Sequence, residues 1–326
     1  MKIRIGWVVF ALSVILFSAS PDGVIAAEKE YPNRPIEMVV VMPPGGPTDV
    51  AARIIQPPLQ SILGVPIVIS NKGGGGGALG AEYAAKSKPD GYTILAHTNA
   101  TLAMVPVLNP AVTYKYTDFT PICFYAVDPV LICSKPDAPW KNADELVAYA
   151  KKNPGKLNYG SSGLGTASYF VMEAFKISNG IDIVPVHFQG SGPAKTAILG
   201  GHVDLAALGL GALIPVIKAG SVIPILTTAE KRMPPLDRVP TMVEKGIPEA
   251  SMSIWMGLSV PARSPKTVVD RLAQAMEKVM KDPATANQLD KAAMTAIHKS
   301  GPEAFTLMAN ELKTVENLSK KMGIVK

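Results

Sequence analysis

Short apolar stretches alternate with glycine-rich turns and helical patterns along this chain, and this alternation constrains the fold more than any other feature. The stretch 36–41 ends at Pro43-Pro44-Gly45-Gly46, and apolar residues at helical spacing follow towards Leu63. The order of strand, glycine turn and helix recurs with strands at 65–70 and 92–96 and a helix at 78–86. Such alternation predicts an α/β fold with a parallel sheet covered by helices on both faces.

The alternation resumes after an apolar stretch at 119–134 that Asp128-Pro129 interrupts. The elements predicted there are helices at 142–151 (capped by Asn142), 167–175 and 193–199 and strands at 157–159, 184–187 and 203–208. A strand at 255–260 and amphipathic helices at 266–280 and 302–322 complete the chain. We therefore predict two α/β lobes joined by crossing segments near 126–130 and 250–255. Residues 28–127 with 252–326 form one lobe, and residues 128–251 form the other.

The first 27 residues are predicted to be a signal peptide. Lys2 and Arg4 precede an uncharged apolar run at 5–17, and small residues lead to Ala26-Ala27. A retained membrane anchor is the alternative, but the run is shorter than the ~20 apolar residues that a spanning helix needs. About 300 residues remain after cleavage, which suits two lobes. We expect a periplasmic protein.

Charge, cysteine and histidine content exclude several classes of function. The net charge is +6, and the basic residues are scattered, so neither a nucleic-acid site nor a polybasic membrane patch is predicted. Cys123 and Cys133 lie in apolar runs, and we favour two buried free thiols over a disulfide. The four histidines are too dispersed to indicate zinc. No metal and no cofactor are expected.

Four predicted strand-to-helix loops are rich in glycine and small hydroxyl residues: 43–49, 97–101, 160–166 and 189–191. Ligands of open α/β sheets bind at the carboxyl ends of the strands, where such loops lie. The first turn of a helix has unpaired N–H groups and a positive dipole end, and both attract anions. None of the four loops contains arginine. The sequence thus predicts a carboxylate held by backbone amides and hydroxyls.

These motifs are also compatible with structures other than an anion site. Gly45 and Gly46 are also compatible with a simple tight turn, and Asp49 is expected to be an N-cap that would repel an anion. The glycine run 73–77 is read as a flexible connector, because it lacks the Lys-Ser/Thr ending of a phosphate-binding loop. The loop 160–166 lacks that lysine too. The glycine-flanked serines do not sit in a G-x-S-x-G elbow, so an enzyme is not expected.

Six segments, in order, resemble the periplasmic solute receptors of the tripartite tricarboxylate transporter family, often called Bug receptors. The segments are YPNRPIEMVVVMPPGGPTDVAAR from Tyr31, NKGGGGGALGAEYAAKSKPDGYTIL from Asn71, LNPAVTYKYTDFTPI from Leu108, YGSSGLGTASYF from Tyr159, VHFQGSGPAKTAILGGHVDLA from Val186 and WMGLSVPARSPKTVVDRL from Trp255. The resemblance implies a venus-flytrap fold like that of type II periplasmic-binding proteins. It also implies a receptor that closes on a small carboxylate and delivers it to a membrane permease.

Carried over by position, the resemblance implies a set of ligand-binding residues. They are Gly45, Gly46, Pro47, Thr48, Thr98 and Asn99 in the first lobe, Ser162, Gly165, Thr166, Gln189, Gly190 and Ser191 in the second, and Asp204 at a strand end facing the cleft. Asp204 is as compatible with a structural role as with an amine-bearing ligand.

Three positions depart from the family pattern. A frequent glycine is Pro47 here, a frequent histidine is Tyr169, and a frequent Lys or Arg is Gln189. Pro47 removes one N–H donor and Gln189 removes a cation. The departures imply a ligand with one well-held carboxylate and a less charged distal part. We expect a monomer with permease partners. A receptor that reports to a signalling partner is the alternative.

Overall fold

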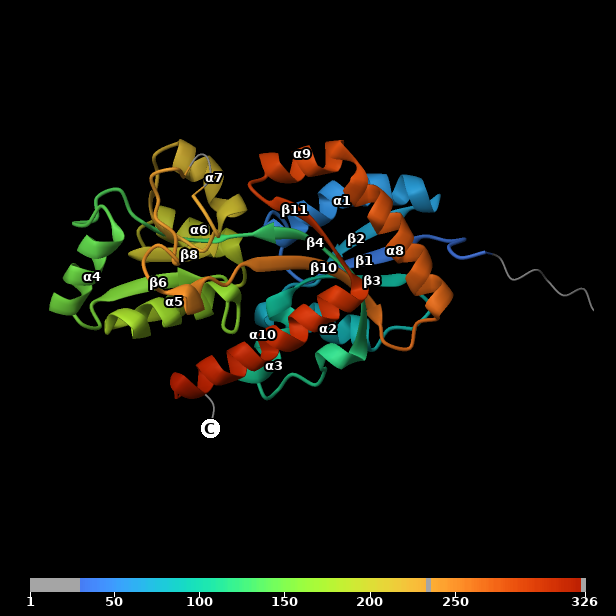
Figure 1. Cartoon of the computed structure of the whole chain (residues 1–326), viewed down its shortest axis with the longest axis horizontal. Coiled ribbons are helices and arrows are strands. Elements are labelled where there is room, and N and C mark those ends of the chain that lie inside the picture. Colours follow the sequence, from blue (N-terminus) through green and yellow to red (C-terminus); the bar gives the residue numbers. More distant parts are fainter. Residues whose placement is uncertain (1–29, 233–235, 324–326) are drawn as a thin grey trace, which may run out of the picture. The chain divides into compact units, whose positions relative to one another are not determined.

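The computed structural model describes residues 30–232 and 236–323, and within them two mixed β-sheets are each flanked by helices (Figure 1). The first sheet has the order β11-β4-β10-β3-β1-β2, and the second has the order β7-β6-β8-β5-β9. The strands of the first sheet are β1 (Ile36–Val40), β2 (Ile67–Asn71), β3 (Thr93–Thr98), β4 (Phe119–Asp128), β10 (Ile254–Pro261) and β11 (Thr295–Ser300). Those of the second are β5 (Val130–Ser134), β6 (Leu157–Ser161), β7 (Ile183–His187), β8 (Leu205–Gly209) and β9 (Ile223–Thr227).

The helices divide between the two sheets. With the first sheet lie α1 (Pro47–Leu63), α2 (Ala78–Ala85), α3 (Val105–Leu108), α8 (Lys266–Lys281), α9 (Pro283–Lys291) and α10 (Gly301–Lys321). With the second lie α4 (Ala143–Lys152), α5 (Ala167–Asn179), α6 (Ser191–Leu199) and α7 (Leu210–Lys218). Short helical turns are η1 (Gly75–Gly77), η2 (Ala100–Met104), η3 (Tyr116–Asp118) and η4 (Pro248–Ala250). We call the first sheet with its helices the first lobe, and the second sheet with its helices the second lobe.

The two-lobe α/β prediction is confirmed, but the expectation of parallel sheets was wrong in part. Strands β1, β2 and β3 are parallel, whereas β10 runs antiparallel to β3 and β4. In the second sheet β6, β7 and β8 are parallel, and β5 is antiparallel to β8 and β9. The chain passes from the first sheet to the second at Pro129, and it returns between β9 and β10. Strands β5 and β10, which follow the two crossings, each run antiparallel to both of their neighbours in the sheet.

Strand alternation buries both faces of the first sheet. In β1, Met38 and Val40 pack in a cluster with residues of α1 and α8, whereas Val39 packs in a cluster with residues of α2 and α10. Each of these three side chains is fully buried. Neighbouring strand residues point to opposite faces, so a strand covered on both sides needs a continuous apolar run. This explains why Glu37 is the only polar residue in the run at 36–41.

The second sheet is buried in the same way, and it contains one of the two cysteines. Leu131 and Cys133 of β5 pack with residues of α6 and α7, and Ile132 packs in the cluster that includes α5. Cys123 lies in β4 of the other lobe. Both thiols are free and buried, as expected, and burial raises the pKa of each to about 12.

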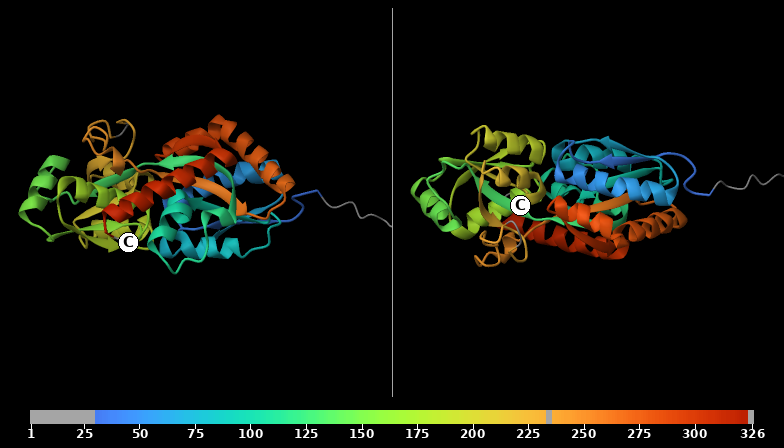
Figure 2. Two further views of the ribbon diagram at one scale, coloured as in Figure 1. Left: turned by 60° about the horizontal axis from the view of Figure 1, so that its bottom comes forward. Right: turned by 90° about the horizontal axis from the view of Figure 1, so that it is seen from above.

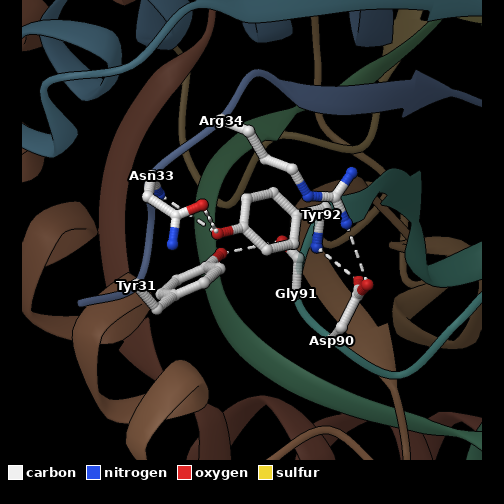
Figure 3. Close-up of polar contacts among 6 residues, drawn as sticks. All are labelled: Tyr31, Asn33, Arg34, Asp90, Gly91 and Tyr92. Atoms are coloured by element: carbon white, nitrogen blue, oxygen red, sulfur yellow. Dashed lines mark hydrogen bonds and ion pairs between the residues drawn. The ribbon is translucent and has the colours of Figure 1, made fainter. Parts of the chain in front are cut away.

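The first described residues are held against the loop that precedes β3 (Figure 3). Tyr31 Oη donates to the carbonyl of Gly91 at 2.7 Å, and the Tyr31 and Tyr92 rings meet edge to face with centroids 5.1 Å apart. Arg34 pairs with Asp90 at 3.0 Å, and its guanidinium carbon lies 3.7 Å from the Tyr92 ring centroid. These contacts align the chain for β1. The predicted signal peptide lies outside the described residues.

Helix α10 belongs to the first lobe but reaches the second. In both views of Figure 2 its C-terminal end, in red, extends past the junction of the two lobes and alongside the second lobe. Val315 of α10 packs in one cluster with Ala100 and Met104 of the first lobe and Tyr169 and Phe170 of the second. Between residues 30 and 232 and between 236 and 323, no helix is both apolar enough and long enough to span a membrane.

A buried carboxylate lies at the first crossing between the lobes. Asp128 ends β4, and its Oδ1 accepts from the N–H of Gly211 at the start of α7 at 3.0 Å. Its Oδ2 has no hydrogen-bond partner among the described residues, and the side chain is fully buried. Loss of hydration raises the pKa of Asp128 to about 7, although backbone hydrogen bonds oppose the change.

This pKa predicts how stability depends on pH. The unfolded chain releases the Asp128 proton near pH 4, whereas the folded protein retains it to about pH 7. The contribution of Asp128 to the free energy of unfolding is therefore fully present below pH 4. It is lost as the pH rises through 7, and the loss is about 4 kcal/mol in total. We expect Asp128→Asn, whose Oδ1 still accepts from Gly211, to flatten the dependence. Urea unfolding of both proteins between pH 4 and 8 measures it, and parallel curves would contradict the assignment.

Candidate functional site

A cavity lies where the carboxyl ends of β1, β3 and β6 and the start of α6 meet. Its lining residues, which define the inner cavity, are Met42, Pro43, Pro44, Gly46, Pro47, Thr48, Thr98, Ala100, Ser162, Thr166, Ala167, Gly190, Ser191, Gly192 and Ile254. They come from both lobes. About 30 Å³ is open to the centre of a water molecule, and one water needs roughly 10–15 Å³ by this measure. The inner cavity therefore has room for a group of a few atoms.

Three helices begin at the inner cavity. The N-caps of α1, α5 and α6 are Gly46, Thr166 and Gly190, and all three line it. A helix cannot pair the N–H groups of its own first turn, and its N-terminus has a partial positive charge. Three such ends at one point produce a site for a negative group without any cationic side chain.

Several backbone donors at these helix starts are unused. Within the described parts of the chain, the N–H groups of Thr48, Ala167, Ser191 and Gly192 have no hydrogen-bond acceptor. All four residues line the inner cavity. Pro47, the first residue of α1, has no N–H to contribute.

Hydroxyl groups provide further donors. Ser162 Oγ lies 3.2 Å from Thr166 Oγ1 and 3.0 Å from Ser168 Oγ, and Thr166 Oγ1 donates to the Gly163 carbonyl at 2.7 Å. Thr98 Oγ1 lies 3.1 Å from Thr101 Oγ1. The hydroxyls of Thr48 and Ser191 have no protein partner among the described residues. The inner cavity thus has donors that can rotate towards an anion.

No charged side chain lines the inner cavity among the described residues. The carboxylate of Asp49, in the first turn of α1, does not line the inner cavity. Its Oδ2 accepts from Gly45 N–H and Arg53 Nε, each at 2.9 Å, and its Oδ1 accepts from Asn71 Nδ2 at 2.9 Å. Burial favours a higher pKa for Asp49, but these hydrogen bonds outweigh it and lower the pKa.

Asp49 is therefore not the N-cap that the sequence suggested, since that position is Gly46. It fixes the loop between β1 and α1, and Asn71 assists by donating also to the Met42 carbonyl at 2.9 Å. The sequence did not point to Asn71, because it is the last residue of β2 and lies far from the loop in sequence. No group of three or more histidine, cysteine or acidic side chains suited to a metal occurs within the described residues.

Comparison with known proteins assigns the family. Residues 51–324 match the family described as tripartite tricarboxylate transporter family receptor. The chain belongs to this receptor family. It is 29% identical over 316 residues to the protein BugT of Bordetella pertussis, which covers 96% of this chain and 97% of BugT.

Solved structures agree with the family assignment. The periplasmic binding protein BugD is 32% identical and superposes with a TM-score of 0.84 over 91% of this chain and 100% of BugD. Rpa4515 of R. palustris, solved with adipate, is 30% identical, with a TM-score of 0.86 over 90% of this chain and 99% of Rpa4515. The chain therefore has the fold of the receptor family along nearly its whole described length.

Eight of the thirteen residues expected at the ligand site line the inner cavity of this family member: Gly46, Pro47, Thr48, Thr98, Ser162, Thr166, Gly190 and Ser191. The cavity also includes residues that were not expected, such as Ala167 and Gly192. Each directly follows an expected residue and lies in the first turn of a helix, so the sequence could have indicated both. Ala100 likewise follows the expected residue Asn99 and lies in the predicted loop 97–101, whereas Ile254 lines the cavity through tertiary packing and had no such signal.

Asn99 does not line the inner cavity, because its amide is fully used elsewhere. Its Nδ2 donates to the Ser253 carbonyl at 3.2 Å and to Glu311 Oε1 at 2.7 Å, and its Oδ1 accepts from Trp255 N–H at 3.1 Å. Asn99 therefore ties the end of β3 to the returning crossing and to α10. Burial raises the pKa of Glu311 to about 7.

Asp204 lies at the end of β8 that is remote from the inner cavity. It precedes β8, whose carboxyl end is Gly209, and it therefore lies on the far side of the sheet from the inner cavity. Its Oδ2 accepts from Asn158 N–H at 3.1 Å, and Lys135 lies 3.4 Å from Oδ1. These contacts give Asp204 a structural part in the sheet.

Gly45 and Gln189 lie beside the inner cavity without lining it. The N–H of Gly45 is used by Asp49. Gln189 lines a second cavity, the outer cavity, with Gly75, Gly76, Val105, Leu108, Asn109, Gly163, Leu164, His187 and Phe188. The glycine run 73–77 is also packed here and is not the flexible connector that was expected, since a Cβ at Gly76 would meet Val105 Cγ2 and the Leu164 carbonyl.

Gly165 is a contact between the lobes. Its φ is +76°, and an added Cβ would lie 3.2 Å from the Val105 Cα of the first lobe. A side chain at this position would therefore strain the backbone and also push against the other lobe.

A matched pair of substitutions separates these two effects. Gly220 has a φ of +67° and no neighbour within 4 Å of an added Cβ. We expect Gly165→Leu and Gly220→Leu each to lose about 1–2 kcal/mol of unfolding free energy from the left-handed backbone. Only Gly165→Leu should also separate the lobes and increase the radius of gyration in small-angle X-ray scattering. Equal radii of gyration for the two variants would show that the separation of the lobes does not depend on the contact at Gly165.

Proposed function

We propose that this chain is an exported receptor that captures a small carboxylate between its lobes and delivers it to a tripartite tricarboxylate-type permease. The observation that carries the proposal is the meeting of three helix N-termini at a cavity with no charged lining residue in the described chain. A member of a receptor family is expected to hold its ligand reversibly, and no cofactor is needed for that.

The chemistry of the inner cavity favours a carboxylate over a cation or a neutral solute. A charge-assisted hydrogen bond contributes about 1.5–3 kcal/mol, and a favourably placed helix N-terminus contributes up to about 2 kcal/mol. The free N–H groups of Thr48, Ala167 and Ser191 provide such donors from three directions. A cation would meet only positive helix ends. A neutral solute would gain much less from the same donors.

Capture between lobes follows from the origin of the lining residues. Residues 28–127 and 252–326 make up one lobe in this proposal, and residues 128–251 make up the other. Gly190 of the second lobe lies against Pro43 of the first, where an added Cβ would be 3.2 Å from Pro43 Cδ. A ligand that binds both lobes stabilises the closed arrangement, so binding shifts the population from open to closed.

Hydrolysis is not part of the proposal, although one serine contacts a histidine. Ser161 Oγ lies 2.9 Å from His187 Nδ1. Ser161 is fully buried and lines neither the inner nor the outer cavity. A nucleophile must reach the bound substrate, and this hydroxyl group does not.

Export to the periplasm completes the proposal. The sequence begins with a charged, apolar and small-residue layout typical of a signal peptide. BugD, which this chain resembles along its length, is described as a periplasmic binding protein. The family description, which names a transporter receptor, supports the proposal of a permease partner.

Removal of one backbone donor tests the proposed grip. Gly192 is the second residue of α6, its N–H is unused among the described residues, and nothing lies within 4 Å of an added Cβ. Gly192→Pro removes the N–H, and a first helical turn tolerates proline. Gly192→Ala retains the N–H and serves as the matched control.

We expect a thermal-shift screen of small carboxylates, adipate included, to identify ligands that raise the melting temperature. For the best ligand, calorimetry should give a Kd about tenfold or more weaker for Gly192→Pro, which is the value of one charge-assisted hydrogen bond, and nearly unchanged for Gly192→Ala. Circular dichroism checks that both variants fold. Equal Kd values would rule out capture by the α6 amide, and no stabilisation by any carboxylate would contradict the proposed function.

A further inference from the structure

Asp128, the buried carboxyl group at the first crossing, is a neighbour of the inner cavity. A Cβ added at Gly209 would overlap Asp128 Oδ2 and would lie 3.1 Å from Pro47 Cγ. Asp128 is also the register partner of Ile254 in the antiparallel pair of β4 and β10. Pro47 and Ile254 both line the inner cavity, whereas Asp128 and Gly209 do not. The carboxyl group therefore lies next to two residues of the cavity wall.

The surroundings of Asp128 favour its protonated form. Its Oδ1 accepts from the Gly211 N–H, but Oδ2 has no partner among the described residues and packs against Gly209. An ionised carboxylate in this place loses most of its hydration, whereas a protonated carboxyl group loses much less. The pKa of about 7 that burial gives Asp128 agrees with this packing. Asp128 therefore changes its charge close to neutral pH.

No charged side chain in the described part of the chain compensates Asp128. Burial and the N–H groups of Leu210 and Gly211 account for its pKa, without a contribution from a neighbouring charge. Strands β8 and β10 have no titratable side chain, and Asp49 and Arg53 of α1 pair with each other at 2.9 Å. The titratable groups on α7, α9 and β11, the other elements beside this place, are Lys218, Asp290, Lys291, His298 and Lys299. The protonation of Asp128 is therefore sensitive to a new charge that binds nearby.

A carboxylate ligand in the inner cavity is such a charge. The proposed grip includes the start of α1, and Asp128 lies beside Pro47, which is the first residue of the same helix. Two negative charges that share one helix N-terminus repel each other, and burial leaves little solvent to screen the repulsion. Protonation of Asp128 removes this repulsion. By linkage, a ligand that binds the protonated form more tightly raises the pKa of Asp128, so a proton is taken up from solvent.

We infer that the receptor takes up a proton at Asp128 when it captures its carboxylate, so that its affinity for the ligand falls as the pH rises. Asp128 does not touch the ligand in this arrangement. It sets the affinity through its charge, behind Pro47 and Ile254 of the cavity wall. The inference rests on the proposed function, because it needs a carboxylate in the inner cavity.

Calorimetry measures this proton uptake directly. The probe is whichever of succinate, glutarate and adipate binds most tightly, since all three are ionised throughout the range from pH 7 to 8.5. For a tenfold coupling, the Kd should rise about fourfold over that range, and binding at pH 7.5 should take up about half a proton. The uptake is the difference in binding enthalpy between Tris and HEPES buffers, divided by the difference in their enthalpies of ionisation.

Two variants assign the proton to a residue. Asp128→Asn is uncharged at every pH and its Oδ1 still accepts from Gly211, so it should bind without proton uptake and with a Kd nearly independent of pH. Glu311→Gln is the matched control and should retain the proton uptake of the wild-type protein. Burial raises the pKa of Glu311 to about 7 as well, but its partner Asn99 does not line the inner cavity.

The outcomes distinguish the inference from the proposed function. Binding without proton uptake by the wild-type protein would overturn the inference and leave carboxylate capture intact. The same holds for uptake that persists in Asp128→Asn or that is lost in Glu311→Gln. Circular dichroism checks folding at each pH, and the wild-type protein and Glu311→Gln decide the matter if Asp128→Asn does not fold. Failure of all three acids to bind at pH 7 would contradict both the inference and the proposed function.

Discussion

The first turn of an α-helix has N–H groups that the helix cannot pair, and in this protein three such turns meet at one cavity. The arrangement follows from the sheets, because parallel strands bring their carboxyl ends, and hence the following helix starts, to the same edge. It also needs loops that hold their shape. Asp49 supplies this for α1 by accepting from Gly45, Arg53 and Asn71. The carboxylate of Asp49 thus fixes the start of α1 at the inner cavity without lining that cavity.

The sequence predicts the parts of this site that depend on local chemistry. Thr48, Thr166 and Ser191 follow strands and lie at helix starts, and such positions can be recognised from glycine, hydroxyl residues and apolar spacing alone. Asn99 and Gly165 have the same local pattern, yet one ties β3 to the crossing and the other touches Val105. Their roles depend on residues more than 50 positions away in the chain. A local pattern cannot distinguish these roles.

For the fold, too, the features that depend on local sequence were predictable and those that depend on distant parts of the chain were not. The helices at 266–280 and 302–322 were predicted almost to the residue, because a long amphipathic stripe is a strong signal, and they are α8 and α10. Helix α7 was missed, since Pro215 lies inside it and its apolar residues have no clear polar face. Strand direction was also out of reach. Whether β5 runs parallel or antiparallel to β8 depends on where the chain crosses between lobes.

In the proposed function the charges that attract the ligand belong to the backbone, and this separates two properties that most binding sites combine. A receptor that holds an anion with arginine loses its grip when that one codon changes. Here a substitution at Thr48, Ser162 or Ser191 removes a hydroxyl but leaves the helix start in place. The side chains around the cavity are consequently free to diverge. Over evolutionary time such a receptor can acquire new ligands by drift in its walls while its affinity for a carboxylate is inherited with the fold.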